Sequence, residues 1–434
     1  MTCREQSRFG SLGPLVLGAL LIGAILRFAR PDVFPYLGDE AWTFRHVEGA
    51  RHGEPWAALG MPSSRGVQNA GMSVWVFIVL GMIGDVSTPT GLVRAVAAFA
   101  FAGHVLLLVL PWRLFSDPAE RKAWTWAFVL TATNPILVFL ERKIWAQSVL
   151  PFFQVALIVA WLRRDTRTGA FVWGLVGAVV GQIHMAGFFF APALVLFTKL
   201  FGKHTTPVRP VRWGAWFLGS AVGAAPAVPW LLYLLRERPP PTSSGSQLLR
   251  FRLEFYQYFF SDPTGLSGSY VIGDDLTRAM EGPVVAGHPT YIVLLAHVAL
   301  AIATIALGVR ALRYVWTRKH ELAALITRPR TETGLLFSAT LFGMGVLMTL
   351  PSISIHRHYM LATFPLAYAW VARIAMRQPR GERWLAVLFA GGAIVSMGIL
   401  AFVDDHGGAD AFGKSYAAQL RDGTSPEAAK GFRP

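Results

Sequence analysis

The chain has 434 residues, of which 53% are apolar and only 15% are charged, and its mean hydropathy is +0.44. A soluble domain carries about 25% charged residues, so this composition excludes a soluble protein and predicts an all-α polytopic integral membrane protein. The single cysteine, Cys3, excludes an internal disulfide framework and a cysteine-based zinc site. A net charge of +15 would suit nucleic acid, but in a membrane protein the first question is on which face the charge lies.

Ten apolar runs are long enough to cross a membrane, or nearly so. The first lacks a small-residue cleavage site before Arg27, so we expect an uncleaved span rather than a signal peptide. The runs are 12–26, 92–111, 123–140, 144–162, 170–198, 213–235, 289–312, 334–350, 358–372 and 384–402.

Two apolar segments leave the topology open. The run 71–84 is short for a span, and its length is typical of an interfacial or re-entrant segment. The run 170–198 is long for one helix, and the glycines and polar groups around His184 would allow two short spans to meet there. The alternative is that 71–84 spans the membrane and 170–198 crosses it once.

The distribution of basic residues favours the first arrangement, with about eleven spans and a cytoplasmic N-terminus. The cytoplasmic loops then hold 22 of the 40 basic and 7 of the 25 acidic residues, so the whole excess of positive charge lies inside. The charge is thereby explained by topology, and no nucleic-acid partner is expected. These loops are 1–11, 111–122, 163–168, 199–212, 310–332 and 373–383.

The chain is therefore expected to form one transmembrane module, residues 1–402, with two outer loops. The first, 27–90, holds an interfacial helix, and the second, 236–288, is a modest loop between spans 7 and 8. Residues 403–434 form a polar tail on the outer side, predicted to be partly disordered. The second loop begins with a Pro/Ser-rich linker and continues into an aromatic stretch. This stretch would cover the site or touch the lipid chain, or else anchor the membrane surface.

An acidic pair, Asp39 and Glu40, follows the first span. An acid pair beside a bilayer is costly unless it has partners or a task. One interpretation is local: Asp39 caps a short helix that begins at Ala41, and Glu40 is an acid of its first turn. The other is functional, because under this topology several distant loops bring charged residues to the same outer rim as Asp39.

Four short stretches resemble the GT-C superfamily of membrane glycosyltransferases, which use polyprenyl-phosphate-linked sugars. The similarity is to the protein O-mannosyltransferase and lipid A aminoarabinose transferase branch, and it implies a GT-C fold and an active site on the outer face of the plasma (inner) membrane. The stretches are Gly38-Asp39-Glu40-Ala41-Trp42, the segment from Asn134 to Ser148, Gly181-Gln182-Ile183-His184, and His356-Arg357-His358-Tyr359 followed by Pro365.

The chain departs from this family in its second outer loop. Several relatives carry a second acid where this chain has Gln147 or Ser148, with Glu141 a turn and a half earlier. Hard divalent cations need several oxygen ligands, so we expect no metal ligands and no cofactor. A divalent metal is possible but not favoured.

The residues suggest a mechanism for sugar transfer to a hydroxyl, which needs a base, an in-line approach and stabilisation of the departing phosphate. Asp39 is the candidate base, and Glu40 orients either Asp39 or the acceptor. Repulsion between the two carboxylates would raise one pKa toward a useful range. The candidate groups for the donor phosphate are Arg357, Arg142, Lys143, His356, His358 and His184. The candidate acceptor or lipid contacts are Tyr256, Tyr258, Trp42 and Tyr359.

Simpler roles remain open for some of these residues. Arg142 and Lys143 could anchor lipid headgroups, and His184 could satisfy backbone carbonyls at a hairpin. The expected partners are a polyprenyl-phosphate sugar donor, a hydroxyl acceptor (lipid, glycan or protein) and membrane lipid. The alternative functions are a transporter or flippase of a lipid-linked substrate and an inactive GT-C-like protein.

Overall fold

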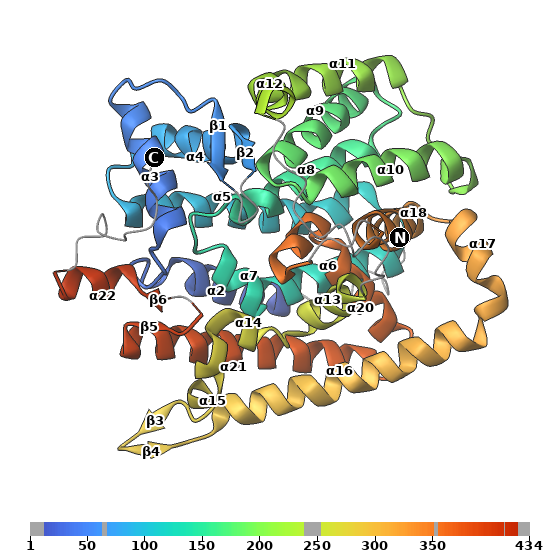
Figure 1. The fold of residues 1–434 in the computed structure, drawn as a ribbon. Coiled ribbons are helices and arrows are strands. Elements are labelled where there is room, and N and C mark those ends of the chain that lie inside the picture. Colours follow the sequence, from blue (N-terminus) through green and yellow to red (C-terminus); the bar gives the residue numbers. More distant parts are fainter. Residues whose placement is uncertain (1–12, 63–66, 238–252, 351–354, 412, 424–434) are drawn as a thin grey trace.

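The computed structural model describes residues 13–62, 67–237, 253–350, 355–411 and 413–423, and these are predominantly helical (Figure 1). In the first half the helices are α2 (Gly13–Phe28), α3 (Gly38–Arg51), α4 (Met72–Ile83), α5 (Pro89–Leu114), α6 (Pro118–Thr133), α7 (Pro135–Leu140), η1 (Ala146–Val149), α8 (Leu150–Leu162), α9 (Arg167–Ile183), α10 (Gly187–Phe201), η2 (Gly202–His204), α11 (Trp213–Ala224), η3 (Ala225–Ala227) and α12 (Val228–Glu237).

The second half holds short helices, then long ones. They are α13 (Glu254–Ser261), η4 (Asp262–Thr264), α14 (Gly268–Ile272), η5 (Gly273–Asp275), α15 (Leu276–Ala279), α16 (Ile292–Thr317), η6 (Lys319–Glu321), α17 (Leu322–Thr327), α18 (Glu332–Ser338), the π-helical turn η7 (Ala339–Met344), α19 (Gly345–Thr349), η8 (Arg357–Thr363), α20 (Leu366–Met376), α21 (Gly381–His406) and α22 (Tyr416–Arg421). Three small antiparallel pairs join β1 (Leu59–Pro62) to β2 (Gln68–Ala70), β3 (Val284–Val285) to β4 (His288–Pro289), and β5 (Gly408–Ala409) to β6 (Gly413–Lys414).

Local sequence signals set where several helices begin. Thr88, Asp117 and Asn134 each precede a proline, and each side chain accepts a hydrogen bond from a backbone N–H of the helix that follows. Proline suits the first turn because its missing N–H has no partner there. Asn134-Pro135 thereby divides the apolar run 123–140 into α6 and α7.

Five helices of the described residues are long and apolar enough to cross a membrane, and η8 with α20, bent by 79°, would make a sixth. With the composition, they make the chain an integral membrane protein. The five are Pro89–Leu114, Trp213–Glu237, Ile292–Thr317, Glu332–Thr349 and Gly381–His406. The expected break in the run 170–198 is present, since α9 ends at Ile183 and α10 begins at Gly187. The number of spans, eleven, stays a prediction.

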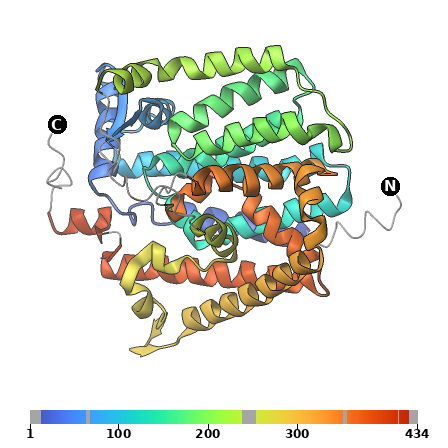
Figure 2. The same cartoon turned by 45° about the vertical axis from the view of Figure 1, so that its right-hand side comes forward.

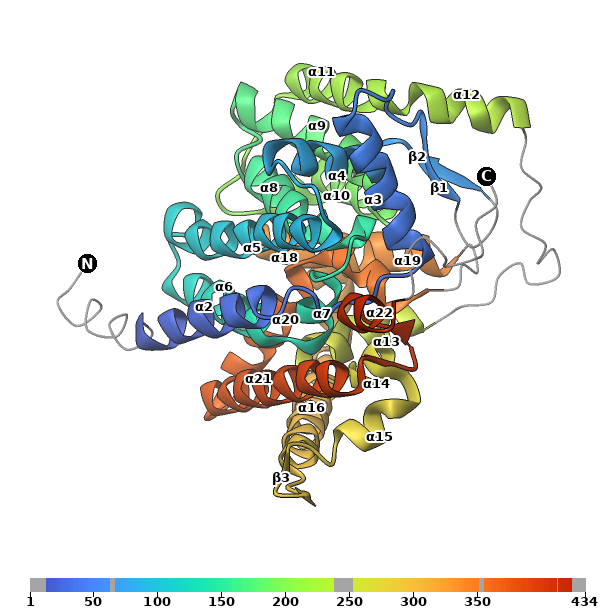
Figure 3. The same ribbon diagram turned by 90° about the vertical axis from the view of Figure 1, so that its left-hand side faces the viewer.

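The long helices lie alongside one another, and their connecting loops gather at two ends of the bundle (Figure 2). At one end, ion pairs join the loops that were expected to be cytoplasmic: Lys122 to Glu382 at 2.5 Å, Arg209 to Asp165 at 3.4 Å and Arg164 to Glu332 at 2.9 Å. At the other end lie α3, the β1–β2 hairpin, α14, α15 and α22, on the right of Figure 3. Which of the two ends faces the outside of the membrane stays a prediction.

The described part of the predicted tail, residues 403–411 and 413–423, folds onto the first outer loop. Helix α21 continues to His406, and the backbone N–H of Tyr416 donates to Phe34 O at 2.8 Å. The Gln419 side chain donates to Tyr36 O at 2.7 Å, and the Tyr416 ring lies 5.1 Å from that of Tyr36. The end of the predicted tail, 424–434, lies outside the described residues, as do residues 1–12 and most of the linker in the second loop, 238–252.

The aromatic stretch of the second loop forms α13, which lies in the core. Phe255 and Phe259 are fully buried, and Phe259 packs edge-on against Trp370 at 5.8 Å between ring centroids. A surface anchor would expose these rings, so that alternative is wrong. Helix α13 thereby places the next turn, η4, inside the bundle end.

Candidate active site

The acidic pair lies in the first turn of α3, which begins at Gly38 after the N-cap residue Leu37. Glu40 is buried, and its Oε2 accepts a hydrogen bond from the Leu37 N–H at 3.1 Å, so it caps its own helix. The expectation that Asp39 caps a helix starting at Ala41 is wrong, because the helix starts three residues earlier. Asp39 is half-buried and lies in the first turn of the helix.

Lys143 lies beside this pair. Its ammonium is 3.1 Å from Glu40 Oε1 and 3.3 Å from the centroid of the Trp145 ring, and the residue is only 4% exposed. A buried ammonium cannot anchor lipid headgroups, so that alternative is wrong for Lys143. The pKa of Asp39 is raised, first by burial and then by the Glu40 charge, while Lys143 opposes the rise. Asp39 is therefore a half-buried carboxylate whose proton affinity exceeds that of an ordinary aspartate.

Imidazole and aromatic rings continue the site from Trp145. The His358 ring lies 5.8 Å from Trp145 and 6.0 Å from His184, and His184 lies 5.2 Å from Tyr359. The break between α9 and α10 and the short helix η8 thus bring together residues more than 170 positions apart. The rings of this histidine cluster are Trp145, His184, Tyr270, His356, His358 and Tyr359.

Burial changes the chemistry of His184, at the break between α9 and α10. It lowers the pKa of His184 to about 4. The His184 imidazole is therefore neutral at pH 7 and would contact a phosphate as a hydrogen-bonding group rather than as a cation. His358 Nδ1 already forms a hydrogen bond of 2.6 Å with the Tyr270 hydroxyl.

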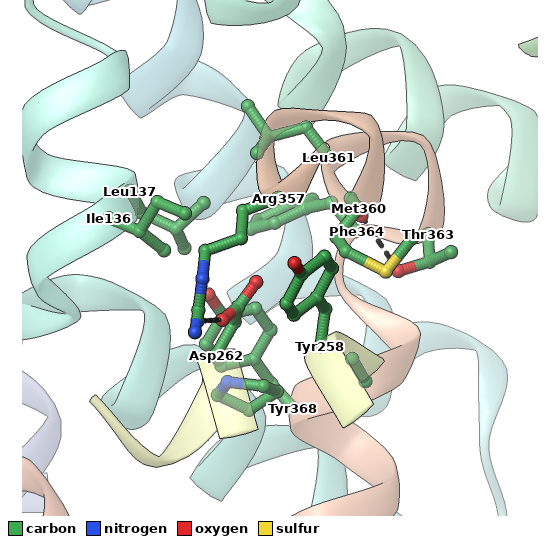
Figure 4. A pocket seen from close by; sticks show the side chains of 12 residues that line it. Ile136, Leu137, Tyr258, Asp262, Arg357, Met360, Leu361, Thr363, Phe364 and Tyr368 are labelled. Atoms are coloured by element: carbon green, nitrogen blue, oxygen red, sulfur yellow. Dashed lines mark hydrogen bonds and ion pairs between the residues drawn. The ribbon is translucent and has the colours of Figure 1, made fainter. Parts of the chain in front are cut away.

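Arg357 lines a small cavity of about 20 Å³, where its side chain reaches toward Asp262 (Figure 4). Its guanidinium forms an ion pair with Asp262 and lies 4.6 Å from the centroid of the Tyr258 ring. Asp262, in η4, is 3% exposed, and burial raises its pKa to about 7 while Arg357 opposes the rise. Sequence reasoning missed Asp262, although an Asp-Pro pair directly after an aromatic helix in an outer loop was a usable signal.

Arg142 is not available to a substrate. Its two terminal nitrogens donate to the carbonyls of Leu26, Arg27, Ala29, Arg30 and Val33 at 2.7–3.3 Å, and the residue is 2% exposed. The guanidinium thereby satisfies the C-terminal carbonyls of α2 and the turn that follows. Both predicted roles, phosphate binding and headgroup anchoring, are wrong for Arg142.

A buried polar cluster inside the bundle was not foreseen. Glu141 Oε2 accepts from Arg27 Nε at 2.5 Å, and Glu141 Oε1 lies 2.9 Å from His104 Nε2. Arg27 also donates to the carbonyls of Gly23, within its own helix, and of Ala132, near the end of α6. The cluster ties α2, α5 and the α6–α7 break together, and it fixes the loop that carries Lys143.

Of the four predicted acceptor or lipid contacts, two lie in the site and two pack against other residues. Tyr258 and Tyr359 lie in the site, under Arg357 and against His358 respectively. Trp42 stacks on His46 of its own helix at 3.9 Å between ring centroids. Tyr256 faces Gly345 of α19, where an added Cβ would lie 2.9 Å from its hydroxyl oxygen, so it packs against that helix.

Within the parts of the chain that the structure describes, no group of three or more histidine, cysteine, aspartate or glutamate side chains is arranged to hold a metal ion. Whether the reaction needs a metal stays a prediction for experiment.

No protein-family model and no curated protein sequence matches the chain. Among solved structures it is similar to the archaeal oligosaccharyltransferase AglB from Archaeoglobus fulgidus in complex with an inhibitory peptide and a dolichol-phosphate, with 14% identity and a TM-score of 0.46. That similarity covers 97% of this chain and 59% of the other. The apo form of the Archaeoglobus fulgidus oligosaccharyltransferase gives 15% identity and a TM-score of 0.44, covering 93% and 55%. The chain thus spans little more than half the length of these structures, and TM-scores below 0.5 carry no conclusion about its activity.

Proposed function

We propose that the chain is a membrane glycosyltransferase that moves a sugar from a polyprenyl-phosphate donor to a hydroxyl acceptor, with inversion at the anomeric carbon. One observation carries the proposal. A half-buried carboxylate with raised pKa, Asp39, is connected through Lys143 and Trp145 to His358, whose neighbour Arg357 carries a guanidinium. A base and an anion-binding group thus lie at the same end of a membrane bundle.

Asp39 would act as the general base. In-line displacement needs the acceptor hydroxyl to lose its proton as it attacks, and a base is more effective when its pKa lies nearer the working pH. Burial and Glu40 shift the Asp39 pKa in that direction. Glu40 itself is held by its cap hydrogen bond and by Lys143, so in this proposal it tunes and places Asp39 without contacting the acceptor.

Arg357 would bind the departing phosphate. A guanidinium offers two parallel N–H donors to phosphate oxygens, and the Arg357 side chain is 16% exposed, so an anion can reach it. The imidazoles of His358 and His184 would add hydrogen bonds. The acceptor class, the sugar and the placement of this end on the outer face of the plasma membrane are part of the proposal, and the placement rests on the distribution of basic residues.

The test is release and transfer of radiolabelled sugar in proteoliposomes, from a panel of polyprenyl-phosphate sugars to added alcohol, glycan and peptide acceptors. Wild type should turn over one donor, and Asp39→Asn should bind it but react roughly 10²–10⁴ times more slowly, the usual contribution of a general base. Glu48→Gln, an exposed acid on the same helix, is the matched control and should react normally. A parallel set with EDTA decides the metal question.

Two outcomes would overturn the proposal. One is that no donor is turned over by wild type. The other is that Asp39→Asn is as active as wild type. If the protein instead moves lipid-linked sugar between leaflets without cleaving it, the transport alternative replaces the enzyme.

A further inference from the structure

The Asp262 carboxylate is held rigidly below Arg357. The backbone carbonyl of Asp262 accepts a hydrogen bond from Asn134 Nδ2 at 2.7 Å, which fixes η4 against the start of α7. Oδ1 faces the Arg357 guanidinium and lies 3.4 Å from the Ser261 hydroxyl. Oδ2 is buried and has no hydrogen-bond partner among the described residues.

The other titratable groups around this carboxylate are tyrosines. Tyr258 of α13, Tyr270 of α14 and Tyr368 of α20 are the titratable neighbours, and none of them is a cation. Among the described residues, Arg357 is the one cation within ion-pair distance of Asp262. The carboxylate therefore depends on Arg357 for its charge. The Arg357 side chain lines the cavity and is 16% exposed, so a second anion can contact it.

We propose that Asp262 is a competing counter-ion for Arg357: the donor phosphate takes the guanidinium from Asp262, and the carboxylate then binds one proton from solvent. The inference rests on the proposed function, because it assigns a second residue to the same donor site. No covalent bond changes in this step. One anion and one proton enter together, and both leave when the polyprenyl phosphate departs.

The physical reason is the cost of an unpaired buried charge. A carboxylate that loses its cation in a water-poor site becomes neutral rather than remain ionised. Burial already raises the pKa of Asp262 to about 7 against the opposing effect of Arg357, so loss of Arg357 raises it further. Between pH 7 and that higher pKa, anion binding requires proton uptake, so affinity falls as pH rises, with a limiting slope of tenfold per pH unit.

The experiment uses the full chain in lipid nanodiscs and a short-chain polyprenyl methyl phosphate as probe. This phosphodiester does not titrate near neutral pH, whereas a phosphate monoester has a pKa of about 6 that would confuse the result. Calorimetry at pH 8 in two buffers of different ionisation enthalpy counts the protons taken up, and affinity is measured from pH 6 to pH 9. Sugar transfer by the same preparation is measured alongside.

Wild type should take up about one proton per probe at pH 8 and lose affinity above pH 7. Asp262→Asn should take up none, bind with the same affinity across the range, and at pH 8 bind about tenfold more tightly than wild type. Asp404→Asn is the matched control, because Asp404 also pairs with an arginine at this end, Arg30, at 2.6 and 2.9 Å, and it should behave as wild type.

Several results would overturn the inference. If wild type binds the probe without proton uptake but still transfers sugar, Asp262 does not compete, and the proposed function stands. If Asp262→Asn keeps the proton uptake, a histidine of the cluster takes the proton instead. If Asp262→Asn does not fold, the absence of proton uptake by wild type at pH 8 still overturns the inference. If wild type neither binds the probe nor transfers sugar, the proposed function fails as well.

Discussion

Substitution of Arg142 by alanine separates a structural role from a role in donor binding. The guanidinium donates to five carbonyls at the end of α2, and three of these hydrogen bonds are 2.9 Å or shorter: those to Leu26, Ala29 and Arg30. Alanine would leave these acceptors without their donor inside a buried corner of the bundle end. We therefore expect loss of stability rather than loss of donor affinity.

The magnitude follows from the number of short hydrogen bonds. A hydrogen bond to a charged group contributes about 1.5–3 kcal/mol, and water reaches some of the freed carbonyls and reduces the loss. Three short bonds, partly compensated, give a destabilisation of roughly 3–5 kcal/mol. Arg142→Lys should recover part of it, because an ammonium offers three donors in a less extended arrangement.

The assay is thermal inactivation in detergent, followed as a half-life because large membrane proteins unfold irreversibly. Arg142→Ala should inactivate much faster than wild type, while its KM for the donor, measured before inactivation, should be unchanged. Arg30→Ala is the control, because Arg30 is 57% exposed in an ion pair with Asp404 and such pairs contribute about 1 kcal/mol or less. An Arg142→Ala protein with wild-type half-life and a large rise in KM would refute the structural interpretation.

Two further predictions concern residues that support Asp39. Because Lys143 lowers the pKa of Asp39, Lys143→Met should raise that pKa further and move the acid limb of the kcat/KM profile to higher pH. The control Lys122→Met, at the opposite end of the bundle, should leave the limb in place. If Lys143→Met also leaves it in place, Lys143 does not act on the catalytic base. Tyr416→Ala should destabilise the packing of the segment before α3 by about 2 kcal/mol, which is measured as faster hydrogen exchange in that segment, and it should lower kcat. The control Leu420→Ala, at an exposed position of the same helix, should change neither hydrogen exchange nor kcat. Equal exchange in both variants would show that α22 does not hold the loop.

Much of the helical architecture was predictable because its signals are local. Apolar runs mark the long helices, Asn134-Pro135 marks a break, and the glycines and polar groups around His184 mark the turn between α9 and α10. Helix ends depend on neighbours within one turn, so the sequence determines them closely. The predicted start of α3 was wrong by three residues. The Glu40 side chain accepts a hydrogen bond from the backbone N–H of the N-cap residue Leu37, so no Ser, Thr, Asn or Asp was needed at the N-cap.

The sequence predicted which residues gather in the candidate site better than it predicted what each of them does there. Asp39, His184 and His358 were identified as residues of one rim, and the structure places them at one end of the bundle. Arg142 and Lys143 were identified as phosphate ligands from their charge alone, and the structure pairs both with protein groups instead. Charge and position in a loop do not reveal which charges satisfy one another.

The sequence by itself determined that this is a helical membrane protein, where its apolar helices lie, and which loops are rich in charge. These properties follow from hydrophobicity, charge and capping, which are set by residues near one another in the chain. Only the tertiary structure decided that Arg142 caps α2 across 109–116 residues and that Arg357 pairs with Asp262 across 95. The physical reason is that a buried charge takes the nearest partner in space, and the folding of the whole bundle determines which partner that is.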